Sequence, residues 1–198
     1  MAPGRRHEAG PRPSSRRPRV SAGNDLRILW QGRHLDAVAR GRWEFVRRRG
    51  SSGVVGIVPI TDDGRLVLVE QFRPPIARPS IELPAGLVGD SPDLQGESLI
   101  VAARRELHEE TGYEARRMTF LGEAYSSPGL SDELVTLMLA GGLSKTGDGG
   151  GDDTEEITVH EVALGEVYDY LARRFQAGAA IDFKIYAGLY LAEHAPRT

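Results

Sequence analysis

The spacing of apolar residues divides the chain after residue 24 into short strands, with helices between and after them. Runs of β-branched and apolar residues bounded by Gly, Pro, Asn and Asp predict strands. The segments GVVGIVPI and RLVLVEQF flank a turn that ends in Asp-Gly, which predicts that they pair as a hairpin. The strands expected from this pattern are Leu26–Trp30, Trp43–Arg47, Gly53–Ile60, Arg65–Phe72, Ile81–Ala85, Thr119–Tyr125, Glu133–Ala140 and Ile157–Leu164.

Apolar residues at helical spacing predict a central helix, Glu97–Thr111, which Gly112 is expected to end. Two amphipathic helices are expected at Glu166–Gln176 and Phe183–Glu193. Strands before, between and after a central helix indicate an α+β sandwich, because a doubly wound sheet would need regular alternation. The apolar positions of the central helix are Leu99, Ile100, Ala103 and Leu107.

Three segments lack apolar periodicity. Residues 1–24 are rich in Pro, Gly, Ser and Arg and are expected to be a disordered tail. Gly86–Gly96 is expected to be a loop, and the low-complexity segment Lys145–Asp153 a flexible one. The chain is therefore divided into a tail (1–24), N-terminal strands (25–50) and a main domain (51–198).

Composition narrows the class of protein. The 198 residues are 40% hydrophobic and 27% charged, as in ordinary globular proteins. No apolar run approaches the roughly 18 residues that span a bilayer. The tail contains RRPR, but no apolar region follows it, so we reject an export signal and predict a cytoplasmic location without a membrane partner. The absence of Cys excludes disulfides, thiolate metal sites and a cysteine nucleophile.

The net charge of -3 conceals an asymmetry. Residues 1–24 carry six Arg and one acid, a charge of +5, so the remainder of the chain carries -8. A basic arm favours phosphate and is compatible with nucleic-acid binding. No aromatic residues interleave with these Arg, however, so a solvated tail is the preferred interpretation and nucleic acid is disfavoured as a partner.

The central helix crowds three carboxylates onto one turn. Glu106, Glu109 and Glu110 fall within about 100° of arc, and like charges at these spacings destabilise a helix. A solvated acidic face is one interpretation, and a bound cation that neutralises the carboxylates is the other. Hard oxygen ligands without Cys favour Mg²⁺ or Mn²⁺ over zinc. Arg105 and Glu97 lie on another side of the helix and are expected to pair.

The spacing favours the cation. Glu97, seven residues, and then REL-H-EE-T-G-Y from Arg105 resemble the Nudix box, G-x5-E-x7-R-E-U-x-E-E-x-G-U with U apolar. One departure occurs at the first Gly, where this chain has Ser91. The counterpart is Gly86 in the sequence ELPAG, which implies an insertion of five residues within Leu87–Gly96.

The resemblance implies the Nudix α/β/α sandwich, with a mixed sheet and the box as loop–helix–loop. It also implies divalent-cation-dependent hydrolysis of a nucleoside diphosphate linked to another moiety. Bound cations would bridge carboxylates and phosphates and acidify a water molecule. By resemblance, the expected metal ligands are Glu106, Glu110, the Ala85 carbonyl, and Glu109 as a ligand or water-holder.

Features outside the box resemble the ADP-ribose pyrophosphatase subgroup. The SPG…E pattern places Pro128 sixteen residues after Gly112, although a plain Pro-Gly turn is the alternative. The segment VEQFRPP resembles the part of the subgroup in which an Arg, here Arg73, meets substrate phosphates; a surface Arg is the alternative. The resemblance also places Glu82 among the substrate-binding residues.

The resemblance extends to the two Trp residues and to the catalytic base. Aromatic residues of the N-terminal strands sandwich the adenine in similar proteins, which implies that Trp30 and Trp43 bind the base here. The resemblance also implies a homodimer that exchanges these strands. Core packing or burial in a dimer is the alternative for Trp30, and Trp43 is the better candidate. In the subgroup, a Glu on a loop before a late strand deprotonates the attacking water; Glu155 is the candidate, with Glu156 in reserve.

The function predicted from the sequence is hydrolysis of ADP-ribose or a related nucleoside diphosphate sugar to AMP (NMP) and a sugar phosphate. GDP-mannose or another nucleoside diphosphate sugar is an alternative, because the inserted loop can reshape the sugar end of the site. A non-catalytic nucleotide sensor is a second alternative, against which the complete set of box Glu residues argues. A nucleic-acid enzyme is a third, supported by the tail alone.

Overall fold

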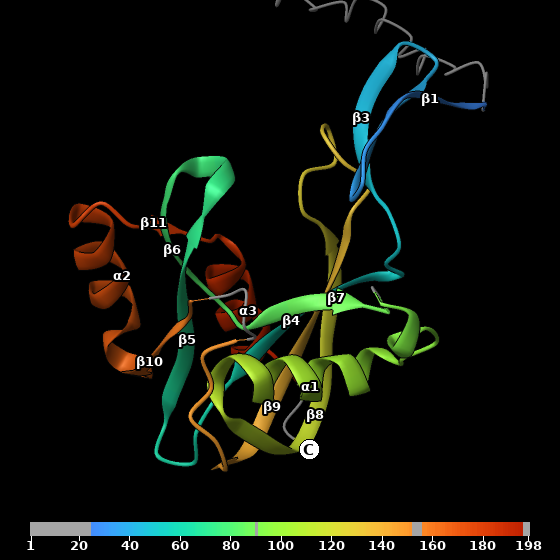
Figure 1. Ribbon diagram of the computed structural model, residues 1–198. Helices are drawn as coiled ribbons and strands as arrows, with labels where there is room; N and C mark the ends of the chain where they lie inside the picture. The colour runs from blue at the N-terminus through green and yellow to red at the C-terminus, as the bar shows by residue number, and fades with distance from the viewer. Residues whose placement is uncertain (1–24, 90, 152–155, 196–198) are drawn as a thin grey trace, which may run out of the picture.

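The computed structural model describes residues 25–89, 91–151 and 156–195 (Figure 1). In these residues the chain forms three β-sheets and three α-helices, so the predicted α+β class with mixed sheets is confirmed. No helix in the described part of the chain is long and apolar enough to cross a membrane. The helices are α1 (Leu99–Thr111), α2 (Val167–Gln176) and α3 (Lys184–Glu193), with 3-10 turns η1 (Pro74–Ile76), η2 (Pro92–Leu94) and η3 (Leu164–Glu166).

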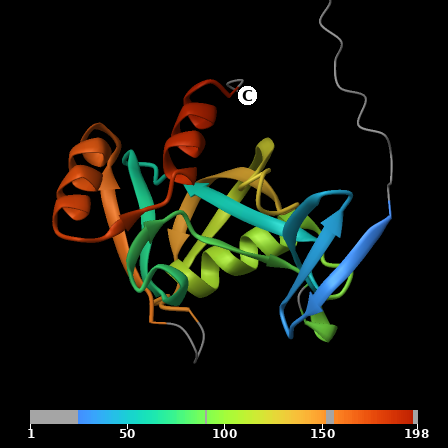
Figure 2. The same ribbon diagram turned by 90° about the horizontal axis from the view of Figure 1, so that it is seen from above.

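The central sheet has helices on both faces. Helix α1 packs on one face and α3 on the other (Figure 2). Side chains on both faces of strand β4 (Gly53–Pro59) are therefore buried, which explains its nearly continuous apolar sequence. The strand order is β7 (Ala85–Val88), β4 (Gly53–Pro59), β9 (Leu134–Lys145) and β8 (Tyr113–Tyr125), with β4 and β9 parallel and the other pairs antiparallel.

The structure contains a second mixed sheet, and the predicted hairpin is wrong because its two strands lie in different sheets. Its order is β10 (Thr158–Ala163), β5 (Arg65–Arg73), β6 (Arg78–Glu82) and β11 (Ala180–Ile181), and α2 packs beside it. The segments GVVGIVPI and RLVLVEQF are β4 and β5, which lie in different sheets and share one isolated bridge, Ile60–Leu66. Each strand has two other neighbours in its own sheet, and these long-range pairings override the local turn.

The N-terminal strands form a small antiparallel sheet that stands apart from the other two (Figures 1 and 2). It contains β1 (Leu26–Gln31), β2 (Leu35–Arg40) and β3 (Trp43–Arg48). Strand β2 lies between the expected strands Leu26–Trp30 and Trp43–Arg47, where no strand was predicted. Its Val38 and Ala39 are buried, whereas large apolar residues on β1 and β3 are exposed.

Helix α1 begins and ends on capping residues. The Ser98 side chain accepts a hydrogen bond from the Val101 N–H, and Gly112 ends the helix with a φ of 71°. The predicted stop at Gly112 is confirmed, and the start lies two residues later than expected. Ala102, Ala103 and Leu107 are buried, whereas Ile100, another of the apolar positions, is 46% exposed.

Other boundaries differ from the pattern because of local chemistry. The expected strand Ile81–Ala85 divides into β6 and β7, because Pro84 has no N–H with which to continue the ladder. Strands β8 and β9 extend beyond the predicted ranges, and the two-residue β11 was not predicted. The tail, residues 1–24, lies outside the described residues.

Candidate functional site

Arg105 is the centre of the charge cluster on α1. Its guanidinium binds both carboxylate oxygens of Glu97, at 3.1 and 3.2 Å, so the predicted pair is confirmed. It also donates to Glu106 and Glu109, each at 2.9 Å, and to the Leu87 carbonyl at 3.3 Å. Hydrogen bonding to Glu97 and the charge of Glu106 raise the pKa of Arg105 above its ordinary value. The Arg105 guanidinium therefore links α1 to the strand that contains Leu87.

Two box carboxylates lie against β7. Glu110 is 3% exposed, and its Oε2 accepts a hydrogen bond from the Ala85 N–H at 3.1 Å. Glu106 lies so close to Gly86 that a Cβ there would be 1.8 Å from Glu106 Oε1. The structure thus brings both residues together with the Ala85–Gly86 backbone, and the insertion after Gly86 does not displace this contact.

The carboxylate and backbone oxygens of this cluster fit a hard divalent cation. Buried carboxylates are stable only when they are paired, hydrogen-bonded or bound to a cation, and Glu110 is among the most buried charged groups described. Carboxylate and backbone oxygens are the ligands that Mg²⁺ prefers. Among the described residues no three acidic or His side chains converge on one point, and Glu106 and Glu109 are both paired with Arg105.

Arg73 and Glu82 form a bidentate pair where β5 ends. The two hydrogen bonds measure 2.8 and 2.7 Å, and Glu82 is 6% exposed. Burial alone would raise the pKa of Glu82, but the hydrogen bonds and charge of Arg73 outweigh burial and lower it. Glu82 therefore holds the half-exposed Arg73 side chain in a fixed position. Glu82 itself lies three residues before Ala85, where β7 begins.

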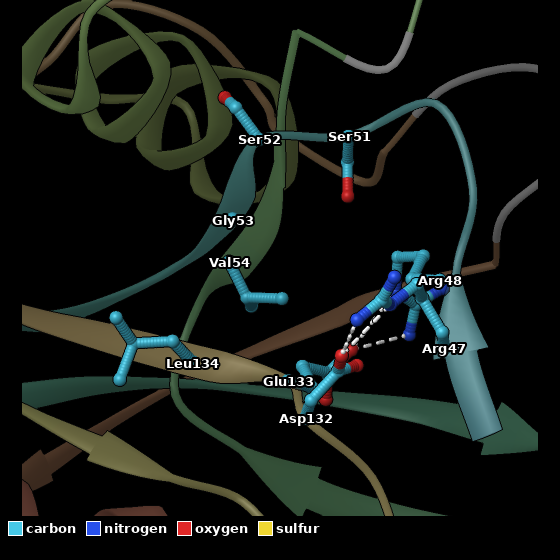
Figure 3. A pocket seen from close by; sticks show the side chains of 9 residues that line it. All are labelled: Arg47, Arg48, Ser51, Ser52, Gly53, Val54, Asp132, Glu133 and Leu134. Atoms are coloured by element: carbon cyan, nitrogen blue, oxygen red, sulfur yellow. Dashed lines mark hydrogen bonds and ion pairs between the residues drawn. The ribbon is translucent and has the colours of Figure 1, made fainter. Parts of the chain in front are cut away.

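A pocket of about 230 Å³ opens between β3, β4 and β9 (Figure 3). Two ion pairs line it, Arg47–Asp132 at 2.6 Å and Arg48–Glu133 at 2.8 Å. Sequence reasoning missed Arg47 and Arg48; the signal was the run of three Arg that begins at the last residue of a predicted strand. The other lining residues are Ser51, Ser52, Gly53, Val54 and Leu134.

The pocket and the carboxylate cluster lie along one strand. Gly53 lines the pocket, and Gly56 pairs with Ala85 beside the carboxylates. Three residues of extended chain separate these two points, a distance of roughly 10 Å. Strand β4 therefore connects the pocket with the carboxylate cluster.

Comparison with known proteins identifies the family. The sequence profile of the NUDIX domain matches residues 51–182. The chain belongs to the Nudix family. The chain is 37% identical over 123 residues to the ADP-ribose pyrophosphatase of Bacillus subtilis (strain 168), covering 62% of this chain and 64% of that protein. It is 36% identical over 147 residues to the ADP-ribose pyrophosphatase of Mycobacterium tuberculosis (strain ATCC 25618 / H37Rv), covering 74% and 67%.

Two further similarities concern a regulator and a solved structure. The methanol dehydrogenase activator of Bacillus methanolicus is 38% identical over 132 residues, 66% of this chain and 67% of that protein. The chain therefore spans about two thirds of the length of these relatives. The crystal structure of an ADP compounds hydrolase matches with a TM-score of 0.64 and 24% identity, covering 85% of this chain and 90% of the other. This last similarity supports the Nudix fold.

The two Trp residues lie on the N-terminal sheet beside the Nudix domain. Trp30 is 62% and Trp43 59% exposed, so core packing within the chain is wrong for Trp30, and burial in a dimer stays a prediction. Trp30 lies over Gly32, where a Cβ would be 2.3 Å from the indole ring. Trp43 begins β3, the strand whose other end contributes Arg47 and Arg48 to the pocket.

The segment that contains Pro128 connects β8 to β9 and is tied to β3. The Val46 N–H donates to the Leu130 carbonyl at 2.8 Å, next to the two ion pairs of the pocket. The segment therefore also helps to position the pocket residues Asp132 and Glu133, which follow Ser131 in the sequence. Pro128 itself is exposed and does not line the pocket.

The candidate base of this Nudix protein, Glu155, lies outside the described residues. Glu156 is described and exposed. The preceding segment differs from the prediction of a flexible loop, since residues 146–151 are hydrogen-bonded to the end of α1. The Gly residues that looked like low complexity allow this close contact.

Proposed function

We propose that the protein hydrolyses the pyrophosphate bond of ADP-ribose or a related nucleoside diphosphate sugar, giving AMP (NMP) and a sugar phosphate. The observation that carries this proposal is the placement of Glu106 and Glu110 against Ala85–Gly86, with a separate polar pocket roughly 10 Å away along β4. The names of the two pyrophosphatase relatives support the same substrate class.

The reaction needs divalent cations, and we propose Mg²⁺ or Mn²⁺. Glu106, Glu110, Glu109 and the Ala85 carbonyl would hold them. When bound, the cations supply Lewis acidity and an acidified water molecule. Arg105 fixes the helix that carries these ligands, because its hydrogen bonds join α1 to Leu87 and Glu97.

The chain itself supplies charge, orientation and a proton acceptor. Arg73, oriented by Glu82, offsets the negative charge of the substrate phosphates with its planar fork. The pocket takes the nucleoside. Trp43 lies at the other end of β3 from the pocket, so it stacks on the base across the proposed dimer interface, which contributes about 1–3 kcal/mol. Trp30 and the Pro128 segment complete this end of the site. Glu155, or Glu156 in reserve, accepts a proton from the attacking water.

A substrate panel tests the proposal. With Mg²⁺, the protein is incubated with ADP-ribose, GDP-mannose, other nucleotide sugars and nucleoside triphosphates, and products are identified by mass. We expect AMP and ribose 5-phosphate from ADP-ribose, and loss of turnover in EDTA that Mg²⁺ or Mn²⁺ restores. Preference for a triphosphate would contradict the proposal. Tight binding of ADP-ribose without turnover would favour the nucleotide sensor.

The base is tested by Glu155→Gln beside Glu156→Gln. Removing a general base lowers kcat by about a hundredfold or more, whereas the reserve residue should change it little. Single-turnover kinetics at saturating Mg²⁺ measure the effect. A normal rate for Glu155→Gln together with a large loss for Glu156→Gln would exchange the two assignments.

We further propose that the protein is a homodimer that exchanges its N-terminal strands. The exposed apolar surface of β1–β3 supports this, because monomers rarely expose such clustered large residues. Sedimentation velocity should give about twice 21.6 kDa, and replacing the exposed Ile28 and Leu29 by Ser should shift the protein toward 21.6 kDa. A wild-type monomer at micromolar concentration would refute the dimer. The exposed residues are Ile28, Leu29, Trp30, Leu35 and Trp43.

The Arg73–Glu82 pair predicts a pH-dependent contribution to stability. The pKa of Glu82 is lowered in the folded state, so its contribution is complete above the unfolded pKa of about 4.5 and is lost as pH falls through the folded pKa. Glu82→Gln should lower the free energy of unfolding by roughly 1.5 kcal/mol at pH 7, with the difference from wild type shrinking at acid pH. Urea unfolding across pH 3–7 measures it; a constant difference would contradict the pairing.

A further inference from the structure

The connection from β9 to β10 begins with residues 146–151, a segment named here the glycine anchor. Its backbone N–H groups donate to carbonyls at the end of α1, which have no partner within the helix. These four bonds cover the turn that carries the box carboxylates. The bonds run from Thr146 and Gly147 to Gly112 at 2.8 and 3.1 Å, from Gly150 to Glu110 at 2.9 Å, and from Gly151 to Glu109 at 3.0 Å.

The contact is so close that only glycine fits on either side. A Cβ on Gly149 would lie 2.5 Å from the Thr111 carbonyl carbon and 2.7 Å from the Glu110 oxygen. A Cβ on Gly112 would lie 2.1 Å from the Gly147 oxygen. Because these neighbours are backbone atoms of a helix end, they cannot move aside as a flexible side chain would. The two backbones therefore pack directly on each other.

The anchor also determines where the chain returns. The Ile157 N–H donates to the Gly150 carbonyl at 3.3 Å, immediately before β10 begins. Gly151 is bonded to Glu109 at the last turn of α1, and Ile157 is bonded to Gly150 of the anchor itself.

We propose that the glycine anchor positions the reacting groups, with Gly149 as its principal positioning residue; this rests on the function proposed above. Helix ends fray, and the last turn of α1 carries two of the proposed metal ligands. Bonding its carbonyls to a second backbone keeps Glu109 and Glu110 in place. A displacement of about 1 Å can cost a hundredfold in rate, so a loosened anchor should lower kcat.

Gly149→Ala tests the anchor against Gly178→Ala. Both glycines have positive φ, 72° and 99°, but a Cβ on Gly178 meets nothing within 4 Å, so the control carries the backbone strain without the clash. For Gly149→Ala we expect kcat to fall at least tenfold, with KM for ADP-ribose within about twofold because the pocket lies elsewhere. Gly178→Ala should leave both unchanged.

Mn²⁺ binding, followed by electron paramagnetic resonance of the free ion, provides a readout that needs no substrate. We expect weaker Mn²⁺ binding by Gly149→Ala than by Gly178→Ala even if the protein turns over none of the panel, which separates this inference from the proposed function. Hydrogen exchange on the wild type should show slow Gly150 and Gly151 amides, and needs no folded variant. Fast exchange at both, or equal Mn²⁺ affinity and kcat for the two folded variants, would overturn the inference.

Discussion

Replacing Glu110 by glutamine is expected to lower kcat about a thousandfold or more while leaving the fold intact. A metal ligand supports several kcal/mol of transition-state stabilisation, and each 1.36 kcal/mol is a factor of ten in rate. Glutamine retains an oxygen that can accept the hydrogen bond from the Ala85 N–H. It also removes a buried charge, so the melting temperature should stay equal or rise. Steady-state kinetics and thermal unfolding of the same sample measure both effects.

The matched control is Glu193→Gln, which removes one carboxylate from the exposed end of α3. It should change neither kcat nor the Mg²⁺ concentration that gives half-maximal rate. Glu109→Gln should fall between the two, because Glu109 is 48% exposed and is proposed as a ligand or water-holder. If Glu110→Gln kept the wild-type rate, the carboxylate would be structural and the proposed ligand set wrong.

The core of the site could be predicted because its residues lie close together in the sequence. Helical spacing places Glu106 and Glu110 on one side of α1, and it also predicts the Arg105–Glu97 pair that the structure contains. Glycine stops such as Gly112 are local signals as well. Such features depend on a few neighbouring residues, so long-range packing does not change them.

The pocket could not be predicted, because it is built from three segments that meet only in the fold. Arg48 and Glu133 are 85 positions apart, and no local pattern indicates that they pair. The failed hairpin has the same cause: β4 and β5 are adjacent in sequence, but each finds better partners elsewhere. Turn chemistry indicates where the chain reverses and does not determine which sheet each strand joins.

The glycine anchor shows a different limit. Composition alone cannot distinguish glycines that leave a loop flexible from glycines that allow a close backbone contact. At Gly149 both the positive φ and the neighbouring Glu110 oxygen require glycine, and both are properties of the fold.

Gly86→Ala should abolish most activity with little loss of stability. The added Cβ would lie 1.8 Å from Glu106 Oε1 and 1.9 Å from its Cδ, which are the far end of a flexible side chain. Glu106 can rotate away without disturbing the backbone, so the fold should persist. Its carboxylate would then leave β7, and a ligand displaced by about 1 Å or more costs roughly a hundredfold in rate. Circular dichroism, melting temperature and kcat measure the separation of the two effects.

Glu106→Asp, combined with Gly86→Ala, distinguishes displacement of the carboxylate from general damage to β7. Aspartate is one methylene shorter, so its carboxylate withdraws from the space that the new Cβ occupies. We therefore expect the double variant to be more active than Gly86→Ala alone, and its coupling energy to be favourable. Gly165→Ala, where a Cβ meets nothing within 4 Å, is the control and should behave as wild type. Full activity of Gly86→Ala would show that turnover does not require Glu106 to lie against β7.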